Sequence, residues 1–409
     1  MKRKAFQITL ADIQEAKKEL QRYLQPTPLL YNTWLSEALG CEIYLKLENM
    51  QPIGSFKIRG ATYRISKLTP QQKKLGVVAA SAGNHAQGVA WGSRKLGCSA
   101  IIIMPKTASL MKIQNTRALG AEVILEGLNY DEAFAFAKKM SLKTGRVLVH
   151  AFEDQAIIAG QGTVALEILE QLADVDYVVG SVGGGGLMAG VATVFKALRP
   201  QTKIVGCQAA RASSMIQSVR KGKAIVLDSV NTFADGIAVM RASEKIRKIL
   251  TGKVDYWLEV EEDEMAIAVL TLLEKAKIMT EGSCAAPLAA LDQIKNKIQG
   301  KKVVLIISGG NIDVNLLSRV IDRGLIRTGR RIRLNVLISD RPGSLAQLTD
   351  LIAKQGANIL QAIHDRNEPS TQLGETGVAL TLETRGPEHS AQLLKALKEN
   401  VLRLDLKPL

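Results

Sequence analysis

The stretch Gln51-Pro-Ile-Gly-Ser-Phe-Lys57-Ile-Arg-Gly-Ala61 decides how the rest of the chain is interpreted. Its proline and first glycine mark a turn, and Ser55 is a suitable N-cap for a helix over residues 56–68. Lys57 then lies in the first helical turn, where the positive end of the helix dipole favours the neutral amine. A neutral lysine can attack a carbonyl carbon and form a Schiff base. Taken alone, Lys57 is better explained as a surface lysine of a basic protein.

Length and composition indicate a globular protein of two or three domains. The chain has 409 residues, of which 46% are hydrophobic and 23% charged. The N-terminal residues lack the apolar segment of a secretory signal, and no apolar run reaches the ~20 residues that span a bilayer. Four cysteines (Cys41, Cys98, Cys207 and Cys284) are scattered without a Cys-x-x-Cys pair. This pattern predicts reduced thiols in a cytoplasmic protein and no zinc site.

The net charge of +15 raises the possibility of a nucleic-acid-binding protein. The basic residues are spread singly over predicted helices, and no nucleic-acid-binding motif is present. A solvated basic surface, which helps to attract an anionic cofactor, explains the charge better.

Short β-branched runs alternate with helical patterns along most of the chain, which predicts a parallel sheet covered by helices on both faces. Ligands bind such folds at the carboxyl ends of the strands. The predicted strands are 42–48, 76–80, 100–104, 122–126, 146–151, 177–182, 203–208, 256–260 and 303–308. Predicted helices include 84–96, 107–119, 130–144 and 157–172, and Thr9-Leu-Ala-Asp12 predicts a capping box that opens the first helix.

A run of four glycines (Gly183, Gly184, Gly185 and Gly186) follows the predicted strand 177–182 and precedes a helix that begins at Leu187. Glycines let successive backbone N–H groups converge, and the helix N-terminus adds positive potential. The run therefore predicts a phosphate-binding loop. No Lys-Ser or Lys-Thr follows it, which argues against a nucleotide P-loop.

Gly184-x-Gly186-x-x-Ala189 also matches a dinucleotide-binding fingerprint, which leaves an NAD-dependent dehydrogenase as an alternative. Such an enzyme needs an acidic residue at the end of the next strand. Gln208 occupies that position and weakens the alternative.

Two more polar stretches follow predicted strands. Ser81-Ala-Gly-Asn84-His85 lies at a predicted helix start, where N–H groups and polar side chains suit a carboxylate. A simple N-cap by Asn84 and a structural role for His85 remain open. Ser308-Gly-Gly-Asn311 places a hydroxyl where it can bond an uncharged ring nitrogen, although a plain strand-to-helix turn explains it equally well.

In their residues and in their order along the chain, these stretches resemble motifs of the serine/threonine dehydratases, which belong to the tryptophan-synthase-β-like class of pyridoxal phosphate enzymes. The resemblance covers roughly residues 5–325. It also rests on two further stretches, His150-Ala-Phe-Glu-Asp-Gln-Ala-Ile-Ile-Ala-Gly-Gln-Gly-Thr163 and Ala234-Asp-Gly-Ile-Ala238. It implies an α/β, doubly wound catalytic region of two subdomains over residues 1–325.

The resemblance also implies the site. Lys57 would hold pyridoxal phosphate as a Schiff base and later remove the substrate's α-proton. The implied cofactor-binding residues are Phe56, Lys57, Asn84, Gly183, Gly184, Gly185, Gly186, Leu187, Gly236, Glu281 and Ser308. The implied substrate-binding residues are Ser81, Ala82, Asn84 and His85. The implied reaction dehydrates and deaminates L-threonine, and also L-serine, with serine dehydration or β-replacement as the alternative reaction.

Three departures from the family pattern matter. The stretch from Gln208 to Ser214 contains no carboxylate where some relatives hold a divalent cation, so no metal site is expected. Ala82 replaces the second serine with which serine racemase works on the opposite substrate face, so racemisation should be weak. Glu281-Gly-Ser-Cys-Ala285 differs twice from Glu-Pro-Ser-Gly-Ala, which makes the role of Glu281 less certain.

Residues 326–332 are predicted to be a basic linker, and residues 333–409 a βαββαβ, ferredoxin-like unit. Asp340-Arg-Pro-Gly343 and Gly356-Ala-Asn-Ile359 resemble the ACT domain, an amino-acid-sensing module. The resemblance implies a homo-oligomer, dimer or tetramer, with a small amino acid bound at Gly343, Asn358 and Ile359.

Overall fold

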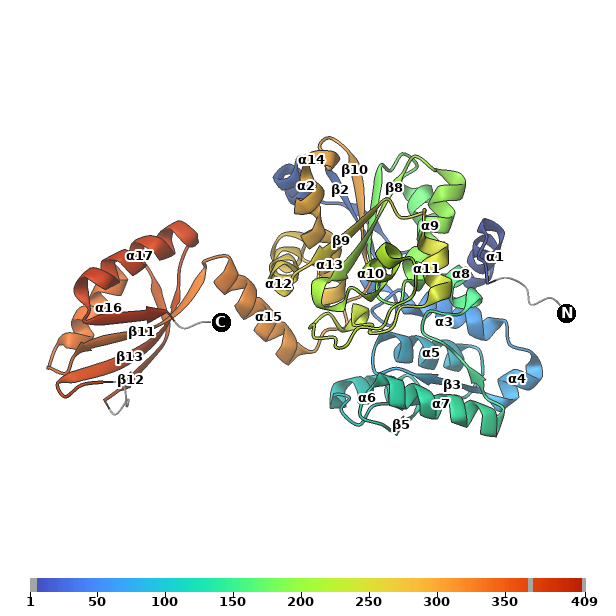
Figure 1. Cartoon of the computed structure of the whole chain (residues 1–409), viewed down its shortest axis with the longest axis horizontal. Helices are drawn as coiled ribbons and strands as arrows, with labels where there is room; N and C mark the ends of the chain where they lie inside the picture. The colour runs from blue at the N-terminus through green and yellow to red at the C-terminus, as the bar shows by residue number, and fades with distance from the viewer. Residues whose placement is uncertain (1–5, 367–370, 407–409) are drawn as a thin grey trace. The chain divides into compact units, whose positions relative to one another are not determined.

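The computed structural model describes residues 6–366 and 371–406 (Figure 1). The chain divides into two compact units, Met1–Asp313 and Val314–Leu409. Within the described residues, no helix combines the length and the apolar character needed to cross a bilayer.

The first unit contains two sheets, and the larger has the strand order β1-β2-β10-β7-β8-β9. Its strands are parallel except for β1, which pairs antiparallel with β2 at one edge. Strand β1 was not predicted because its three residues are too few to show a period. The bounds are β1 (Leu29–Tyr31), β2 (Glu42–Leu47), β7 (Tyr177–Ser181), β8 (Lys203–Ala209), β9 (Tyr256–Val260) and β10 (Lys302–Ile307).

The smaller sheet is fully parallel, in the order β5-β4-β3-β6. Alternate residues of β3 enter different cores: Val77 and Ala79 share one with α5, whereas Val78 and Ala80 share another with α7. Helices therefore cover both faces, as predicted. The bounds are β3 (Val77–Ala80), β4 (Ala100–Met104), β5 (Glu122–Leu125), β6 (Val147–Leu148), α5 (Asn84–Lys95), α6 (Leu110–Ala118) and α7 (Tyr130–Thr144).

Two crossing helices, α3 (Lys57–Ser66) and α8 (Gln155–Gln171), contribute to the cores of both sheets. On α3, Ile58 belongs to the core of the large sheet and Ile65 to that of the small sheet. A Cβ added at Gly160 would lie 2.6 Å from the Cα of Gly60. Glycine at these positions therefore lets the two helix backbones approach closely.

The sequence pattern correctly predicted the capping box of α1 but not the N-cap of α3. In α1, the Thr9 side chain accepts from the Asp12 N–H and the Asp12 carboxylate accepts from the Thr9 N–H. In α3 the N-cap is Phe56, and no side chain caps the helix from that position. Ser55 is buried, its hydroxyl has no partner among the described residues, and the N-cap prediction is wrong. Instead, the first-turn N–H of Gly60 donates to Gln161 Oε1 of α8, at 3.2 Å.

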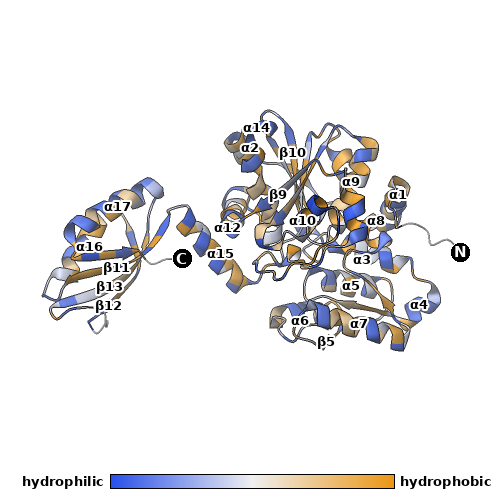
Figure 2. Cartoon of the chain, in the orientation of Figure 1, coloured by the Kyte–Doolittle hydropathy of each residue, from blue (hydrophilic) through white to orange (hydrophobic). Residues whose placement is uncertain are grey.

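Of the remaining elements of this unit, α4 leads into β3 of the small sheet, and the others belong to the large sheet and its loops (Figure 1). Figure 2 shows the alternation of apolar and polar residues along its helices. These elements are α1 (Leu10–Leu20), α2 (Thr33–Leu39), η1 (Glu48–Met50), α4 (Pro70–Leu75), α9 (Gly186–Leu198), η2 (Ala210–Ala212), α10 (Ser214–Lys221), η3 (Asp235–Ile237), α11 (Glu244–Leu250), α12 (Glu262–Thr271), η4 (Leu272–Ala276), α13 (Gly282–Ala289), η5 (Ala290–Ile294) and α14 (Lys295–Ile298).

The second unit begins with α15 (Val314–Arg327) and continues as a βαββαβ unit, which confirms the ferredoxin-like prediction. Its antiparallel sheet has the order β12-β13-β11-β14. The strand side chains Leu334, Val336 and Leu380 form one core with α16 and α17. The bounds are β11 (Arg331–Ser339), α16 (Ser344–Lys354), β12 (Asn358–Asp365), β13 (Glu375–Glu383), α17 (Pro387–Asn400) and β14 (Arg403–Leu406).

The α3–α8 contact generates a stability prediction. Gly160→Ala should lower the free energy of unfolding by about 1–3 kcal/mol, because the new methyl group meets backbone that cannot move aside. Denaturant unfolding of the full chain measures this. Gly83→Ala, where an added Cβ meets nothing within 4 Å, is the control and should change stability by less than about 0.5 kcal/mol. Equal stability of both variants would show that the helix contact tolerates a side chain.

Candidate active site

Three of the predicted polar loops follow the carboxyl ends of β3, β7 and β10, and the structure brings them together with the start of α3. The N–H of Phe56 donates to the carbonyl of Ser308 at 3.0 Å. A Cβ added at Gly309 would lie 3.3 Å from Asn84 Nδ2 and 3.4 Å from Glu281 Oε1. The lysine, the loop after β3, the loop after β10 and Glu281 therefore form one site.

Lys57 is the first residue of α3, and its side chain is partly buried. Its Nζ donates to the carbonyl oxygen of Ala151 at 3.3 Å and lies 5.2 Å from the centre of the Phe56 ring. In the part of the chain that the structure describes, no carboxylate forms an ion pair with it. Burial lowers the pKa of Lys57 to about 8, against a weaker attraction to Glu281. With this pKa the amine is partly neutral at physiological pH, and burial is the cause of the shift.

Ser308 follows β10 directly and is buried. Its Oγ lies 3.0 Å from the Sγ of Cys284, in the first turn of α13. Burial, and next the nearby Glu281, raise the pKa of Cys284 well above its usual value, so the group is a thiol. Ser308 is therefore a neutral hydroxyl beside a neutral thiol, a combination that can bond a ring nitrogen without supplying a charge.

Asn84 and Glu281 are joined across the site. Asn84 Nδ2 lies 3.0 Å from both carboxylate oxygens of Glu281, and Asn84 Oδ1 accepts from Asn311 Nδ2 at 2.7 Å. The Ser283 hydroxyl donates to Glu281 Oε1 at 2.5 Å. Burial raises the pKa of Glu281 despite these donors. The interpretation of Asn84 as an N-cap is wrong, because its side chain takes these partners and Gly83 occupies the N-cap position of α5.

The glycine run lies between β7 and α9, with Gly185 as the N-cap and Gly186 as the first helical residue. Gly185 has φ +85°, a conformation that side chains rarely adopt. A Cβ at Gly184 or Gly186 would meet Phe152, and one at Gly183 would lie 3.0 Å from the carbonyl of Gly236. Leu187 follows in the first turn, whose N–H groups have no acceptor within the helix. The loop can thus present several N–H groups to an anion.

Ser81, Ala82 and Asn84 are all partly buried around the start of α5, with the Gly83 N–H bonded to Ser81 Oγ at 3.1 Å. His85 is buried, and its Nε2 lies 3.0 Å from the carbonyl of Val149. Burial lowers the pKa of His85 to about 3, so the imidazole is neutral. The His85 side chain supports the loop, and its backbone N–H remains available to a substrate.

Sequence reasoning missed two contacts of the site: Cys284 against Ser308, and Phe152 against the glycine loop. Cys284 was noted only as a departure from a family motif, and Phe152 only as part of one. Gln208 lies outside this set of contacts, because its side chain bonds Ala212 and Ile216 inside the fold.

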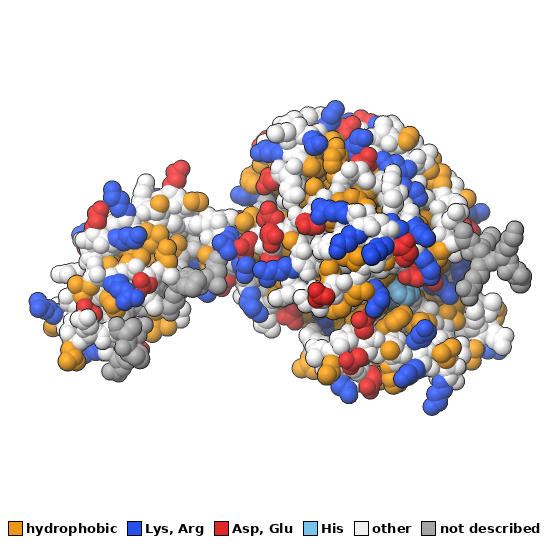
Figure 3. Space-filling model, in the orientation of Figure 1, with side chains coloured by type: hydrophobic (Ala, Val, Ile, Leu, Met, Phe, Trp, Pro, Cys, Tyr) orange, Lys and Arg blue, Asp and Glu red, His pale blue; other side chains and the backbone are white. Residues whose placement is uncertain are grey.

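Figure 3 shows a histidine surface in the hollow between the two lobes of this unit, and Lys and Arg side chains over the neighbouring helices.

Comparison with known proteins shows which families the two units resemble. Residues 20–309 match the family described as "Pyridoxal-phosphate dependent enzyme", and residues 332–401 match the ACT domain. The L-threonine ammonia-lyase of Thermotoga maritima is 46% identical over 390 residues, which cover 95% of this chain and 97% of that protein. The L-threonine ammonia-lyase of Geobacter sulfurreducens is 42% identical over 386 residues, or 94% of this chain and 96% of that protein.

Among solved structures, the processed form of threonine deaminase isoform 2 from Solanum lycopersicum superimposes with a TM-score of 0.75. It is 38% identical in sequence, and the match covers 78% of this chain and 87% of that chain. The fold is therefore the tryptophan-synthase-β-like one that the sequence motifs predicted.

The environment of Lys57 generates a prediction on pH. In protein purified without cofactor, acetylation of Lys57 by trace acetic anhydride should rise with a midpoint near pH 8, because only the neutral amine reacts and its pKa is about 8. Peptide mass spectrometry across pH measures this. Lys67, whose hydrogen bond with Glu15 raises its pKa, is the internal control and should react only at higher pH. A shared midpoint for the two lysines would contradict the lowered pKa of Lys57.

Proposed function

The chain belongs to the family of pyridoxal-phosphate dependent enzymes, and on this basis we propose that it dehydrates and deaminates L-threonine to 2-oxobutanoate and ammonia. The observation that carries the proposal is Lys57: an amine at a helix start, with a pKa near 8, beside the Ser308 loop. Relatives named L-threonine ammonia-lyase that align over nearly their whole length support the choice of substrate. The family match replaces the dinucleotide interpretation of the glycine run.

The residues of the site fit pyridoxal phosphate. Lys57 offers an amine without an ion-pair partner among the described residues, the Gly183–Gly186 loop offers N–H groups to a phosphate, and Ser308 offers a hydroxyl to a ring nitrogen. When bound, the cofactor supplies an electron sink that stabilises negative charge on the substrate's α-carbon. Phe56, Asn84, Gly236 and Glu281 would help to hold the cofactor.

Different side chains and backbone groups of the chain have separate roles in the proposed reaction. Lys57 would hold the cofactor through its amine, and its free amine would take the proton from the substrate's α-carbon; an amine with a pKa near 8 suits a general base at physiological pH. Ser81, Ala82, Asn84 and His85 hold the substrate carboxylate at the N-terminus of α5. Ser308 is a hydroxyl and cannot keep the ring nitrogen protonated as an aspartate would. This weaker polarisation favours prompt loss of the β-hydroxyl over a long-lived carbanion.

L-Serine is the second substrate of the proposal, because it differs from threonine by one methyl group. Such a difference supports only about 10–200-fold discrimination in a hydrophobic pocket. Steady-state kinetics with the two amino acids would show which of them the site prefers.

The second unit is proposed to bind a small amino acid and so to regulate the enzyme. Gly343 is the N-cap of α16, whose N–H groups can take a carboxylate, and Asn358 and Ile359 begin β12. The exposed side chains of Leu360 and Ile363 on β12 support a homo-oligomer, dimer or tetramer, that covers this strand. A role in isoleucine synthesis is proposed with it. Free cysteines at all four positions support a cytoplasmic location.

Ketoacid release from threonine tests the function. The wild-type protein loaded with pyridoxal phosphate should form 2-oxobutanoate, and Lys57→Ala should lower turnover at least ~100-fold, because the α-proton loses its base. The visible absorption of the bound cofactor should change at the same time. Lys67→Ala, which alters an exposed lysine at the end of the same helix, is the control. Near-normal turnover by Lys57→Ala would rule out the assigned role.

Threonine kinetics in the presence of isoleucine or valine test the second unit. At least one of these amino acids should shift the kinetics of the full chain, and Asn358→Ala should weaken the shift while leaving the rate without effector unchanged. Asn400→Ala, an exposed asparagine on α17, is the matched control. If no small amino acid alters the kinetics or the thermal midpoint, the second unit serves only the assembly.

A further inference from the structure

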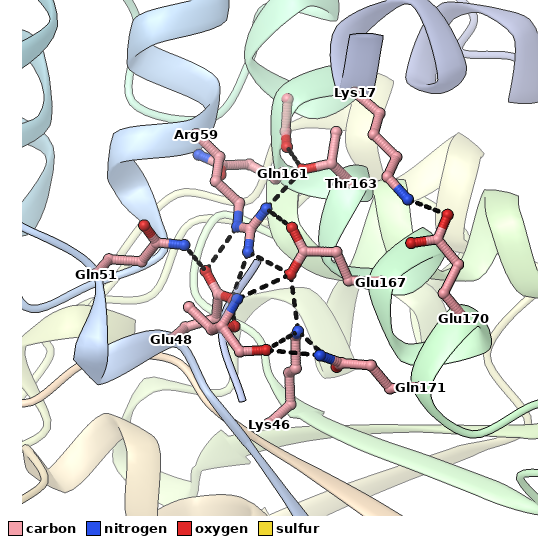
Figure 4. A network of polar contacts seen from close by, with 12 residues as sticks. Lys17, Lys46, Glu48, Gln51, Arg59, Gln161, Thr163, Glu167, Glu170 and Gln171 are labelled. Atoms are coloured by element: carbon pink, nitrogen blue, oxygen red, sulfur yellow. Dashed lines mark hydrogen bonds and ion pairs between the residues drawn. The ribbon is translucent and has the colours of Figure 1, made fainter. Parts of the chain in front are cut away.

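A fully buried network of charged side chains surrounds Arg59, two residues after Lys57 (Figure 4). It contains two cations, Lys46 and Arg59, and two anions, Glu48 and Glu167. The relative exposures are 0%, 2%, 0% and 5% in that order. The network joins β2, η1, α3 and α8, and no step of the proposed reaction uses it.

The Arg59 guanidinium has all of its N–H donors engaged. Nε and Nη2 donate to the two oxygens of Glu48, both at 2.7 Å. Nη1 and Nη2 donate to the two oxygens of Glu167 at 2.6 and 2.8 Å, and Nη1 also donates to Thr163 Oγ1 at 3.1 Å. A planar fork held by two carboxylates from different elements has one permitted orientation.

Lys46 completes the network from the far side of Glu167. Its Nζ donates to Glu167 Oε2 at 2.7 Å, to the carbonyl of Thr27 at 2.7 Å and to Gln171 Oε1 at 2.9 Å. Lys46 thus anchors Glu167 but makes no contact with α3 through these bonds. A variant of Lys46 can therefore weaken the network without removing a bond to α3.

The network reaches both sides of Lys57 along the chain. After Lys57, Arg59 bonds Glu48; before it, Gln51 Nε2 donates to the same carboxylate at 3.3 Å. The Gly54 N–H then donates to the carbonyl of Gln51 at 2.7 Å and closes the turn that leads into α3. The segment that carries Lys57 is therefore fixed at two points to one buried carboxylate.

Burying such a network is not explained by stability alone. Replacing buried ion pairs by apolar residues is often neutral or stabilising, so their value is frequently geometric. Here the fixed geometry is that of the first turn of α3, which has no side-chain cap of its own. A displacement of a reacting group by about 1 Å can cost about 100-fold in rate.

We propose that Arg59, Glu48 and Glu167 are positioning residues that fix the placement of Lys57 through the first turn of α3. The inference rests on the proposed function for Lys57 and deepens it. The three side chains are buried in the network, so they act through the backbone of α3. The Lys46 side of the network contributes stability without this effect.

Two isosteric or near-isosteric variants of the full-length holoenzyme separate the roles. Glu48→Gln weakens the hold on Arg59, and Lys46→Met removes a cation that bonds Glu167, Thr27 and Gln171 but not α3. Both should lower the thermal midpoint. Only Glu48→Gln should lower kcat for threonine, by at least about tenfold with KM within about twofold, and change the visible circular dichroism of the bound pyridoxal phosphate. Lys46→Met should keep kcat within about twofold.

Thr163→Val provides a milder probe in case Glu48→Gln does not fold, since it removes one Arg59 contact and keeps the shape. It should shift kcat and circular dichroism in the same direction by a smaller factor. If the Lys46 and Glu48 variants lose kcat in parallel with their thermal midpoints, or if Glu48→Gln and Thr163→Val keep both kcat and the dichroism band, the network is structural only. Absence of ketoacid from the wild type would instead refute the threonine reaction, and the dichroism comparison would still decide the positioning.

Discussion

The close approach of α3 to its two neighbouring helices is the constraint on which the site depends. An added Cβ at Gly160 of α8 would lie 2.6 Å from the Cα of Gly60, and one at Gly88 of α5 would lie 3.0 Å from the carbonyl oxygen of Lys57. Glycines on all three helices thus let backbone meet backbone on both sides of α3. Because α3 also supplies residues to both hydrophobic cores, the lysine at its start has a fixed place relative to both sheets.

The pKa values of two basic side chains near the start of this helix, Arg59 and Lys57, are shifted in opposite directions. Burial lowers the pKa of Arg59 on its own, but the carboxylates of Glu48 and Glu167 outweigh that effect and raise it. Lys57 experiences burial with only a weak attraction to Glu281, and its pKa falls to about 8. Arg59 thus has two carboxylates bonded to its guanidinium, whereas Lys57 forms no ion pair among the described residues.

Sequence patterns predict the parts of this protein that depend on local chemistry. Buried parallel strands are apolar runs, so β4 matches its predicted range; β9, an edge strand that is only partly buried, matches as well. The polar loops at the strand ends were also predicted, because they too are defined by their local sequence. The N-cap prediction for α3 was wrong, since the helix is capped at Phe56 without a side-chain bond, and the amide of Gly60 bonds Gln161, 101 positions away in the chain. Likewise, nothing local pairs Arg59 with Glu167, which lies 108 positions away, or Ser308 with Cys284.

The distribution of charge across the site matches the proposed elimination chemistry. Two helix N-termini, those of α5 and α9, can offer N–H groups and positive potential to a carboxylate and a phosphate. Ser308 and Cys284 are neutral, and burial raises the pKa of Glu281 so that it gains a proton more readily than an exposed carboxyl. Under the proposed function, this arrangement would hold the anionic groups of cofactor and substrate and place a neutral hydroxyl at the ring nitrogen. The ring would then be a moderate electron sink, which suits loss of a β-hydroxyl.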